Sequence, residues 1–254
     1  MPCLHKELYN SVVQDTIHAL VLSVIKYGET SLITNCFTLE YGLQSYMLKG
    51  ILSKGKKPLS KSLFEPLALL ELKAPKNKEG KIGYIKEAKL LFPYSTIPFD
   101  LRKKALVFFL AEVLQQVGRE EQEPNPALFN FLKKSILWLD QHSEIGLFHI
   151  KMMLDLTQFI GFYPNLTPAT APYFDLESGC MSYEKNQPNT VEDPIKSLWI
   201  QLLGTNFDEL SGIKILKENK SSFLKSVVTY YQLHLQQFKP PKSTDVLNEI
   251  FKAS

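Results

Sequence analysis

The residues best suited to chemistry in this sequence are lysines, and they gather in one short stretch. The segment KGILSKGKKPLSK carries five lysines within 13 residues, and no acid lies between Glu40 and Glu65. Lysines at this density suit the phosphates of a nucleic acid, because each contact releases a condensed counterion. Tyrosines nearby in the sequence could stack on unpaired bases, at ~1–3 kcal/mol per base. The alternative is a solvated loop beside buried tyrosines. The lysines are Lys49, Lys54, Lys56, Lys57 and Lys61, and the tyrosines are Tyr27, Tyr41 and Tyr46.

The same stretch has the spacing of a nucleotide-binding P-loop without its chemistry. Gly50, Gly55 and Lys56 match the pattern G-x-x-x-x-G-K. The next position needs Ser or Thr to hold magnesium, yet it is Lys57, and Pro58 follows where a helix should be under way. The sequence therefore argues against an ATP site here.

No other catalytic or metal-binding pattern emerges from the sequence. The five histidines do not have the spacing of a metal-binding helix, and none is near a cysteine. His142 and His149 are seven residues apart, which a helix cap or core packing explains better than metal ligation. There is no G-x-S-x-G and no carboxylate pair that stands out from ordinary surface acids. We therefore expect no enzyme activity, no catalytic residue and no metal ligand.

Charge is distributed unevenly along the 254 residues. The net charge is +3, but residues 1–90 carry +5 and residues 120–210 carry −8. A basic N-terminal segment followed by an acidic central segment favours a polyanion contact in the N-terminal segment.

The cysteines and the lack of targeting signals concern the location of the protein. Three cysteines that are far apart fit a reducing cytosol, and no segment has the pattern of a signal peptide or a membrane span. We expect a cytoplasmic protein with no membrane partner.

Residue periodicity divides the chain into an extension and two parts. After an extension over 1–16, residues 17–93 hold five short β-type runs separated by turns, which favours a small barrel because closure removes exposed edges. Pro66 should interrupt the fourth strand. From 94 to 254 the period becomes helical, with a loop or small hairpin inserted at about 164–193. The fold class is therefore α+β.

Capping residues suggest where the helices begin. Asp100 stands at the start of one, and Asn125 is the expected N-cap of the next, with Pro126 at its first position. Ser221 or Ser222 should cap a later one. No low-complexity linker separates the two parts, so they should pack together.

The segment ALVLSVIKYGETSLITNCFTLEYGLQSYMLKG closely resembles the opening of RecO proteins. FEPLALLEL, NPALFNFLKKSILWLD, FIGFYPNL and HLQQFKPPKSTDVLNEIF also have counterparts in that family, so the resemblance covers nearly everything after about residue 16. It is closest to the Bacteroidetes form of the family. The landmarks in the opening are Tyr27, Glu29, Phe37, Thr38, Gly42, Lys49 and Gly50.

The resemblance implies a five-stranded OB-fold barrel followed by an α-helical domain. It also implies a recombination mediator of the RecF pathway, cytoplasmic and associated with the nucleoid during repair. Such proteins bind single- and double-stranded DNA, anneal complementary strands and, with RecR, help load RecA on strands coated by single-stranded-DNA-binding protein (SSB). The acidic C-terminal tail of SSB should dock on a partly apolar, basic-rimmed patch of the helical domain, with the lysines between Lys214 and Lys225 as candidates.

The expected DNA-binding residues follow from the basic stretch and from the start of the first helix. They are Lys26, Tyr27, Tyr46, Lys49, Lys54, Lys56, Lys57 and Lys61 in the barrel, and Arg102, Lys103 and Lys104 beyond it.

One departure from the family concerns zinc. Many RecO proteins carry a four-cysteine zinc site after the central helix, but the segment 164–189 contains only Cys180. A single thiolate cannot make a tetrahedral structural site. We expect a zinc-free form without a cofactor, held instead by packing of Tyr173, Phe174 and Met181.

Two other functions are compatible with the residues. One is an RNA-binding OB-fold protein that acts in translation or RNA handling. The other is a protein-interaction scaffold whose lysines only increase its solubility.

Overall fold

The computed structural model describes residues 15–55, 59–77, 81–120, 123–185 and 188–252. Most of the expected N-terminal extension therefore lies outside the described residues, as do Lys56 and Lys57 of the basic stretch. The first strand begins at Asp15, so residues 15 and 16 belong to the sheet and not to the extension.

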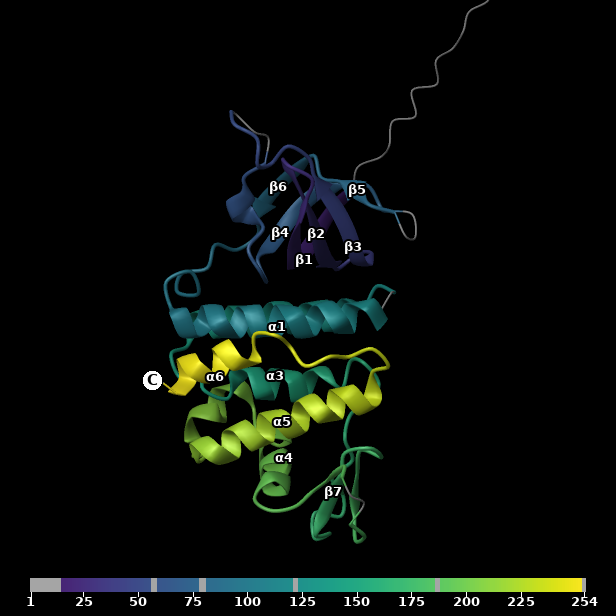
Figure 1. Cartoon of the computed structure of the whole chain (residues 1–254), viewed down its shortest axis with the longest axis vertical. Coiled ribbons are helices and arrows are strands. Elements are labelled where there is room, and N and C mark those ends of the chain that lie inside the picture. Colours follow the sequence, from purple (N-terminus) through teal and green to yellow (C-terminus); the bar gives the residue numbers. More distant parts are fainter. Residues whose placement is uncertain (1–14, 56–58, 78–80, 121–122, 186–187, 253–254) are drawn as a thin grey trace, which may run out of the picture.

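The N-terminal part is a six-stranded sheet that curls into a half-barrel at one end of the molecule (Figure 1). Its strand order is β5-β3-β2-β1-β4-β6. All pairs are antiparallel except β3 with β5. The elements are β1 (Asp15–Tyr27), β2 (Ser31–Thr38), β3 (Gly42–Leu48), the 3-10 turn η1 (Lys61–Leu63), β4 (Leu69–Ala74), β5 (Gly83–Tyr84) and β6 (Glu87–Leu90).

Glycine turns and an alternating burial pattern determine how these strands form the sheet. Gly28 and Gly42 have φ of 63° and 64°, a left-handed conformation that glycine adopts without strain, at the turns that join β1 to β2 and β2 to β3. Along β2, buried and half-buried residues alternate, so one face lies on the barrel core and the other faces outward. Pro66 precedes β4, which begins only at Leu69, so the predicted interruption is confirmed.

The remainder is mainly helical, and the predicted α+β class with an N-terminal OB-type barrel is confirmed. The helices are α1 (Leu101–Glu120), α2 (Pro126–Gln141), α3 (Phe148–Leu156), α4 (Ile195–Leu203), α5 (Lys217–His234) and α6 (Thr244–Lys252), with a 3-10 turn η2 (Phe207–Gly212) before α5. Asn125 caps α2, since its side chain accepts a hydrogen bond from the backbone N–H of Leu128, and Pro126 is the first helical residue.

A small three-stranded sheet stands at the opposite end of the molecule from the barrel (Figure 1). It consists of β7 (Tyr173–Asp175), β8 (Cys180–Ser182) and β9 (Thr190–Val191), so the predicted hairpin exists and gains a third strand. Phe174 is fully buried, with its ring centroid 4.9 Å from that of Trp199 in α4. Met181 and Tyr173 are both half-buried, and Met181 packs on the same core.

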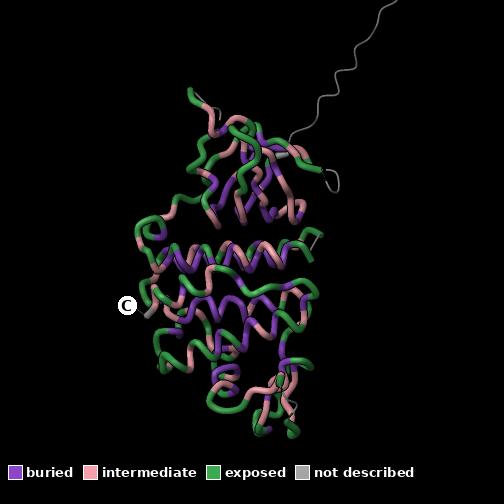
Figure 2. The backbone as a smooth tube through the Cα atoms, viewed as in Figure 1, coloured by how far each residue is buried: buried purple, intermediate pink, exposed green. Residues whose placement is uncertain are grey.

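The two parts share one hydrophobic core. Leu20, Leu22 and Phe37 of the barrel belong to the same buried cluster as α1 and the helices beneath it. A second cluster, around Tyr46 and Leu48, fills the barrel itself. Buried residues run along both sides of α1 in Figure 2, because the barrel covers one side and the helices cover the other. The prediction that the parts pack together is confirmed.

Two predictions of elements are wrong. The last β-type run is divided into β5 and β6, which lie at opposite edges of the sheet, so the sheet has six strands where five were expected. Helix α5 begins at Lys217, four residues before Ser221, and its N-cap position is Leu216, which makes no side-chain cap.

Candidate nucleic-acid interface

The outward face of the barrel sheet carries an apolar row across four strands. Strand pairing places Ile25 beside Ile33, Ile33 beside Met47, and Met47 beside Tyr84. Ile25 is 56% exposed and Tyr84 is 55% exposed, while the two residues between them are half-buried. Because the solvated face of an antiparallel sheet is normally polar, this row indicates a binding surface.

Tyr27 extends this surface by a second exposed ring. It lies two residues after Ile25 on the same face of β1 and is 53% exposed. Two exposed tyrosine rings on one ordered sheet face are suitable platforms for unpaired bases. We call Ile25, Tyr27, Ile33, Met47 and Tyr84 the barrel face.

A hydrogen-bonded polar row borders the barrel face and fixes its strands in register. Asn35 donates through Nδ2 to Ser23 Oγ at 3.0 Å, and Ser45 donates through Oγ to Asn35 Oδ1 at 2.6 Å. These bonds join the outer sides of β1, β2 and β3. Tyr27 is therefore carried by a strand whose register is fixed, so little order has to be gained there when a nucleic-acid strand binds.

Several exposed lysines of the barrel take part in no ion pair with another described residue, and four of them are among the predicted DNA-binding residues. By contrast, Lys73 pairs with Glu87 at 3.0 Å and Lys89 pairs with Glu71 at 2.8 Å, so those two charges are compensated. The four lysines are Lys26, Lys49, Lys54 and Lys61.

The basic loop after β3 is anchored to the barrel at both of its ends. Ile51 and Leu59 are buried in the barrel core, and the backbone N–H of Leu52 donates to Thr30 O at 2.9 Å. Gly50 has φ of 67°, so this glycine makes a left-handed turn at the end of β3. Lys54 is thereby presented to solvent from a fixed base.

Two predicted DNA-binding residues are excluded by burial. Tyr46 has no exposed surface, because it points inward with Leu48, and burial raises the pKa of its hydroxyl. Lys103 is only 3% exposed, and its Nζ donates to Thr96 Oγ1 at 2.6 Å and to Asp140 O at 3.0 Å. Neither side chain can reach a nucleic acid, so both predictions are wrong.

The other predicted residues beyond the barrel lie at the start of α1. Arg102 is half-buried and pairs with Asp100 at 3.2 Å, while Lys104 is exposed. The predicted start of this helix is confirmed, since the Asp100 carboxylate accepts the backbone N–H of Arg102 at 2.8 Å.

Sequence reasoning assigned Tyr46 to the wrong face although a signal was present, and it missed Tyr84. Tyr46 is two residues from Leu48, so strand alternation would have placed it on the core side with that leucine. Tyr84 lies in a short run whose pairing with β3 could not be read from the sequence.

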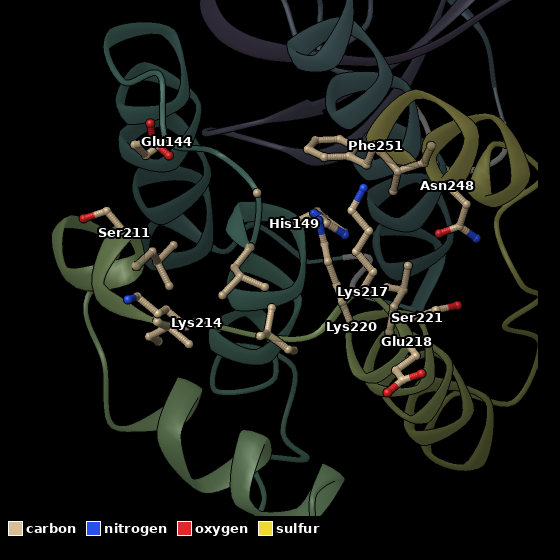
Figure 3. Close-up of a pocket in the computed structure, with 17 residues that line it drawn as sticks. Glu144, His149, Ser211, Lys214, Lys217, Glu218, Lys220, Ser221, Asn248 and Phe251 are labelled. Atoms are coloured by element: carbon tan, nitrogen blue, oxygen red, sulfur yellow. The ribbon is translucent and has the colours of Figure 1, made fainter. Parts of the chain in front are cut away.

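A pocket of about 680 Å³ opens on the helical part, at the start of α5 (Figure 3). Residues from the start of α3, η2, the N-terminal end of α5 and α6 surround it. Its floor is apolar and its rim is basic, with Glu144 and Glu218 also present. The apolar lining is Leu147, Leu210, Ile213, Ile215, Leu224, Leu247 and Phe251, and the basic residues are Lys214, Lys217 and Lys220.

Two nitrogen-bearing side chains in this pocket lack a polar partner among the described residues, one a hydrogen bond and the other an ion pair. The Nδ1 atom of His149, a buried residue, has no hydrogen-bond partner among the described residues. Lys220 lies beside it (Figure 3), with Nζ 4.3 Å from the centroid of the Phe251 ring and no ion pair to a described residue. Burial, with a smaller contribution from Lys217, lowers the pKa of Lys220 to about 8. A cation held without a counter-ion beside an apolar hollow suits an incoming carboxylate.

The described residues hold no group of three or more His, Cys, Asp or Glu side chains that could bind a metal ion. His142 ends α2, where its ring Nδ1–H donates to Trp138 O at 2.8 Å, and His149 packs in the core, as their spacing predicts. In the part of the chain that the structure covers, none of the helices is both long enough and apolar enough to cross a membrane.

Two family models match the chain and together span most of it. The model described as recombination protein O N terminal matches residues 13–94, and recombination protein O C terminal matches residues 98–245.

Curated relatives give the same result. The chain is 39% identical over 233 residues to a protein of Christiangramia forsetii named DNA repair protein RecO. These residues make up 92% of this chain and 97% of the relative. The chain is 35% identical over 245 residues to the protein of that name from Bacteroides fragilis, covering 94% of this chain and 100% of the relative.

Proposed function

The chain belongs to the recombination protein O (RecO) family of DNA repair proteins, and from that premise we propose that it is a non-enzymatic recombination mediator. It binds single- and double-stranded DNA and anneals complementary strands. With RecR it promotes the loading of RecA on DNA coated by SSB. It acts in the cytoplasm, associated with the nucleoid while repair is under way.

The barrel face is the observation that carries this proposal. A mediator must bind strands of any sequence, which requires phosphate contacts and stacking surfaces in place of base-reading groups. Tyr27 and Tyr84 offer the stacking surfaces, and exposed barrel lysines without a described ion-pair partner offer the phosphate contacts.

The experiment that tests the proposal measures binding and annealing in the same protein. The wild-type chain should bind an oligothymidylate and should accelerate the annealing of complementary DNA strands. Tyr27→Ala/Tyr84→Ala should lose most of both activities while retaining its far-UV circular dichroism. Tight binding to RNA, with weak binding to DNA of the same sequence, would instead support an RNA-handling protein.

We assign the acidic C-terminal tail of SSB to the pocket at the start of α5. Leu210, Leu224 and Leu247 offer it an apolar floor, and Lys220 offers an uncompensated charge. The N-terminal end of α5 adds a partial positive charge, and no side chain caps it. These groups fit a peptide that combines apolar side chains with carboxylates. The assignment lies within the basic segment expected from the sequence.

The docking assignment is tested with a synthetic peptide that copies an SSB tail. Lys220→Glu should weaken peptide binding by at least about ten-fold, because it puts a negative charge where a carboxylate should bind. Lys225→Glu is the matched control, since Lys225 is exposed on the same helix but does not line the pocket. Equal effects of the two changes would reduce the assignment to a general charge effect and refute the pocket.

A further inference from the structure

A second exposed aromatic surface lies where the barrel joins the helical part. Phe99 is 86% exposed on the turn before α1, and Phe108 is 51% exposed within α1. Leu101, Lys104 and Phe108 recur at the spacing of one helical face, and all three are exposed. Phe92 lies at the other end of the connecting segment, with Lys133 Nζ 5.0 Å from its ring centroid. We call Phe92, Phe99, Leu101, Lys104 and Phe108 the junction face.

The turn that carries Phe99 is fixed to α2 by hydrogen bonds. The carboxylate of Asp140 in α2 accepts backbone N–H bonds from Ser95, Thr96 and Ile97, at 2.7, 2.8 and 2.9 Å. The buried Lys103 closes the arrangement through its bonds to Thr96 and Asp140. An exposed phenyl ring on so firmly anchored a turn is preorganised for contact with another molecule.

The charge around the junction face is positive. Lys104 is exposed and forms no ion pair with a described residue, and Lys133 lies over the Phe92 ring. Arg102 is paired with Asp100, and the buried Lys103 lies against Asp140, so neither adds a free charge to this surface. Protein interfaces tend to be depleted of lysine, whereas surfaces for unpaired nucleic acid combine exposed aromatic rings with cations. The composition therefore favours a polyanion with flat bases over a protein partner.

The junction face is separate from the barrel face. Leu22 of β1 lies against Gly118 of α1, and Tyr27 is five residues farther along the strand, which is roughly 16 Å. Gly118 is in turn 17 residues beyond Leu101, about 25 Å along the helix. The connecting segment also leaves the sheet from β6, at the edge opposite β5 and Tyr84. One short stretch of DNA therefore cannot cover both faces.

We propose that the junction face binds a second single strand of DNA at the same time as the barrel face holds the first. This inference rests on the proposed function. It explains how the protein can anneal DNA, since two strands must be held on one molecule before they can pair. Phe99 and Phe108 stack on bases, and Lys104 contacts phosphate. Lys103 is a positioning residue that fixes the turn beneath Phe99.

The test asks whether one molecule holds two strands. Two oligothymidylates, one labelled with a donor dye and the other with an acceptor, cannot pair with each other, so energy transfer requires that both lie on the same protein. Wild-type protein should give energy transfer. Phe99→Ala/Phe108→Ala should abolish it, should still bind one strand, and should slow annealing at least about ten-fold. Tyr183→Ala is the matched control, because Tyr183 is an exposed ring at the distant small sheet.

A second measurement does not depend on loss of function. Phe99→Trp places a fluorophore on the anchored turn, and oligothymidylate should quench it beyond the quenching of the wild-type protein. When Tyr27→Ala/Tyr84→Ala is added, the quenching should still be reached at higher oligothymidylate concentration, because the junction face is intact in that variant. Unchanged energy transfer in Phe99→Ala/Phe108→Ala, or no additional quenching in Phe99→Trp, overturns this inference alone. A wild-type protein that binds no DNA overturns the proposed function as well.

Discussion

Phosphate contacts and base stacking on the barrel face can be separated by their response to salt. Each phosphate contact with a single strand contributes ~0.7 to the slope of log affinity against log salt. Lys49→Gln/Lys54→Gln removes two exposed lysines without described ion-pair partners, so the slope should fall by about 1.4. Between 50 and 200 mM salt, this difference makes the wild-type affinity fall about seven-fold more than that of the variant.

The two tyrosines should change affinity without changing the slope. Stacking contributes ~1–3 kcal/mol per base, so Tyr27→Ala/Tyr84→Ala should cost at least about 2 kcal/mol, or roughly 30-fold in affinity. Since the rings carry no charge, that loss should be the same at every salt concentration.

Fluorescence anisotropy of a labelled oligothymidylate at several salt concentrations measures both quantities. Lys73→Gln/Lys89→Gln is the matched control, because these barrel lysines are already paired with Glu87 and Glu71. Its slope should stay close to that of the wild type. If the Lys49/Lys54 variant behaves like this control, or if the tyrosine variant retains wild-type affinity, DNA does not bind the barrel face.

Three further predictions concern the helical part. Asp140→Ala should destabilise the fold by about 3 kcal/mol in urea unfolding, because three backbone N–H groups lose their acceptor. Burial opposes ionisation of Asp140, but these N–H bonds outweigh it and hold its pKa below the ordinary value, so the stabilisation should be complete at pH 7 and should decline below about pH 4; a constant difference would contradict this. Affinity for the SSB tail peptide should fall from pH 7 to pH 9 as Lys220 loses its proton, and Lys220→Arg should remove that decline. Elemental analysis should find substoichiometric zinc, since Cys180 stands alone in its segment; one zinc per chain would refute the packing account.

Much of the fold could be predicted from the sequence because local signals were strong. The change from short β-type runs to a helical period marked the junction between the two parts, and Asn125 with Pro126 marked the start of α2. The division of the last run into β5 and β6 could not be predicted, since it depends on which distant strand each half pairs with. Helix α5 begins before its serines because no local cap determines its start.

The candidate site was predictable in its chemistry and less so in its residues. Lys49 and Lys54, which lie in the basic loop after β3, are exposed as expected. Lys103 could not be recognised as buried, because its partner Asp140 is 37 residues away and they meet only in the fold. Tyr46 could have been placed in the core from its alternation with Leu48, whereas the exposed position of Tyr84 could not be predicted because it depends on the pairing of β5 with β3.

The central claim is that this chain brings DNA strands together through the barrel face. The most direct measurement is the rate at which complementary strands coated with SSB anneal, with wild-type protein, with Tyr27→Ala/Tyr84→Ala and with the paired-lysine control. We predict that the wild type and the control accelerate annealing and that the tyrosine variant leaves it close to the spontaneous rate. A wild-type protein that leaves the rate unchanged, or a tyrosine variant as active as the wild type, would contradict the claim.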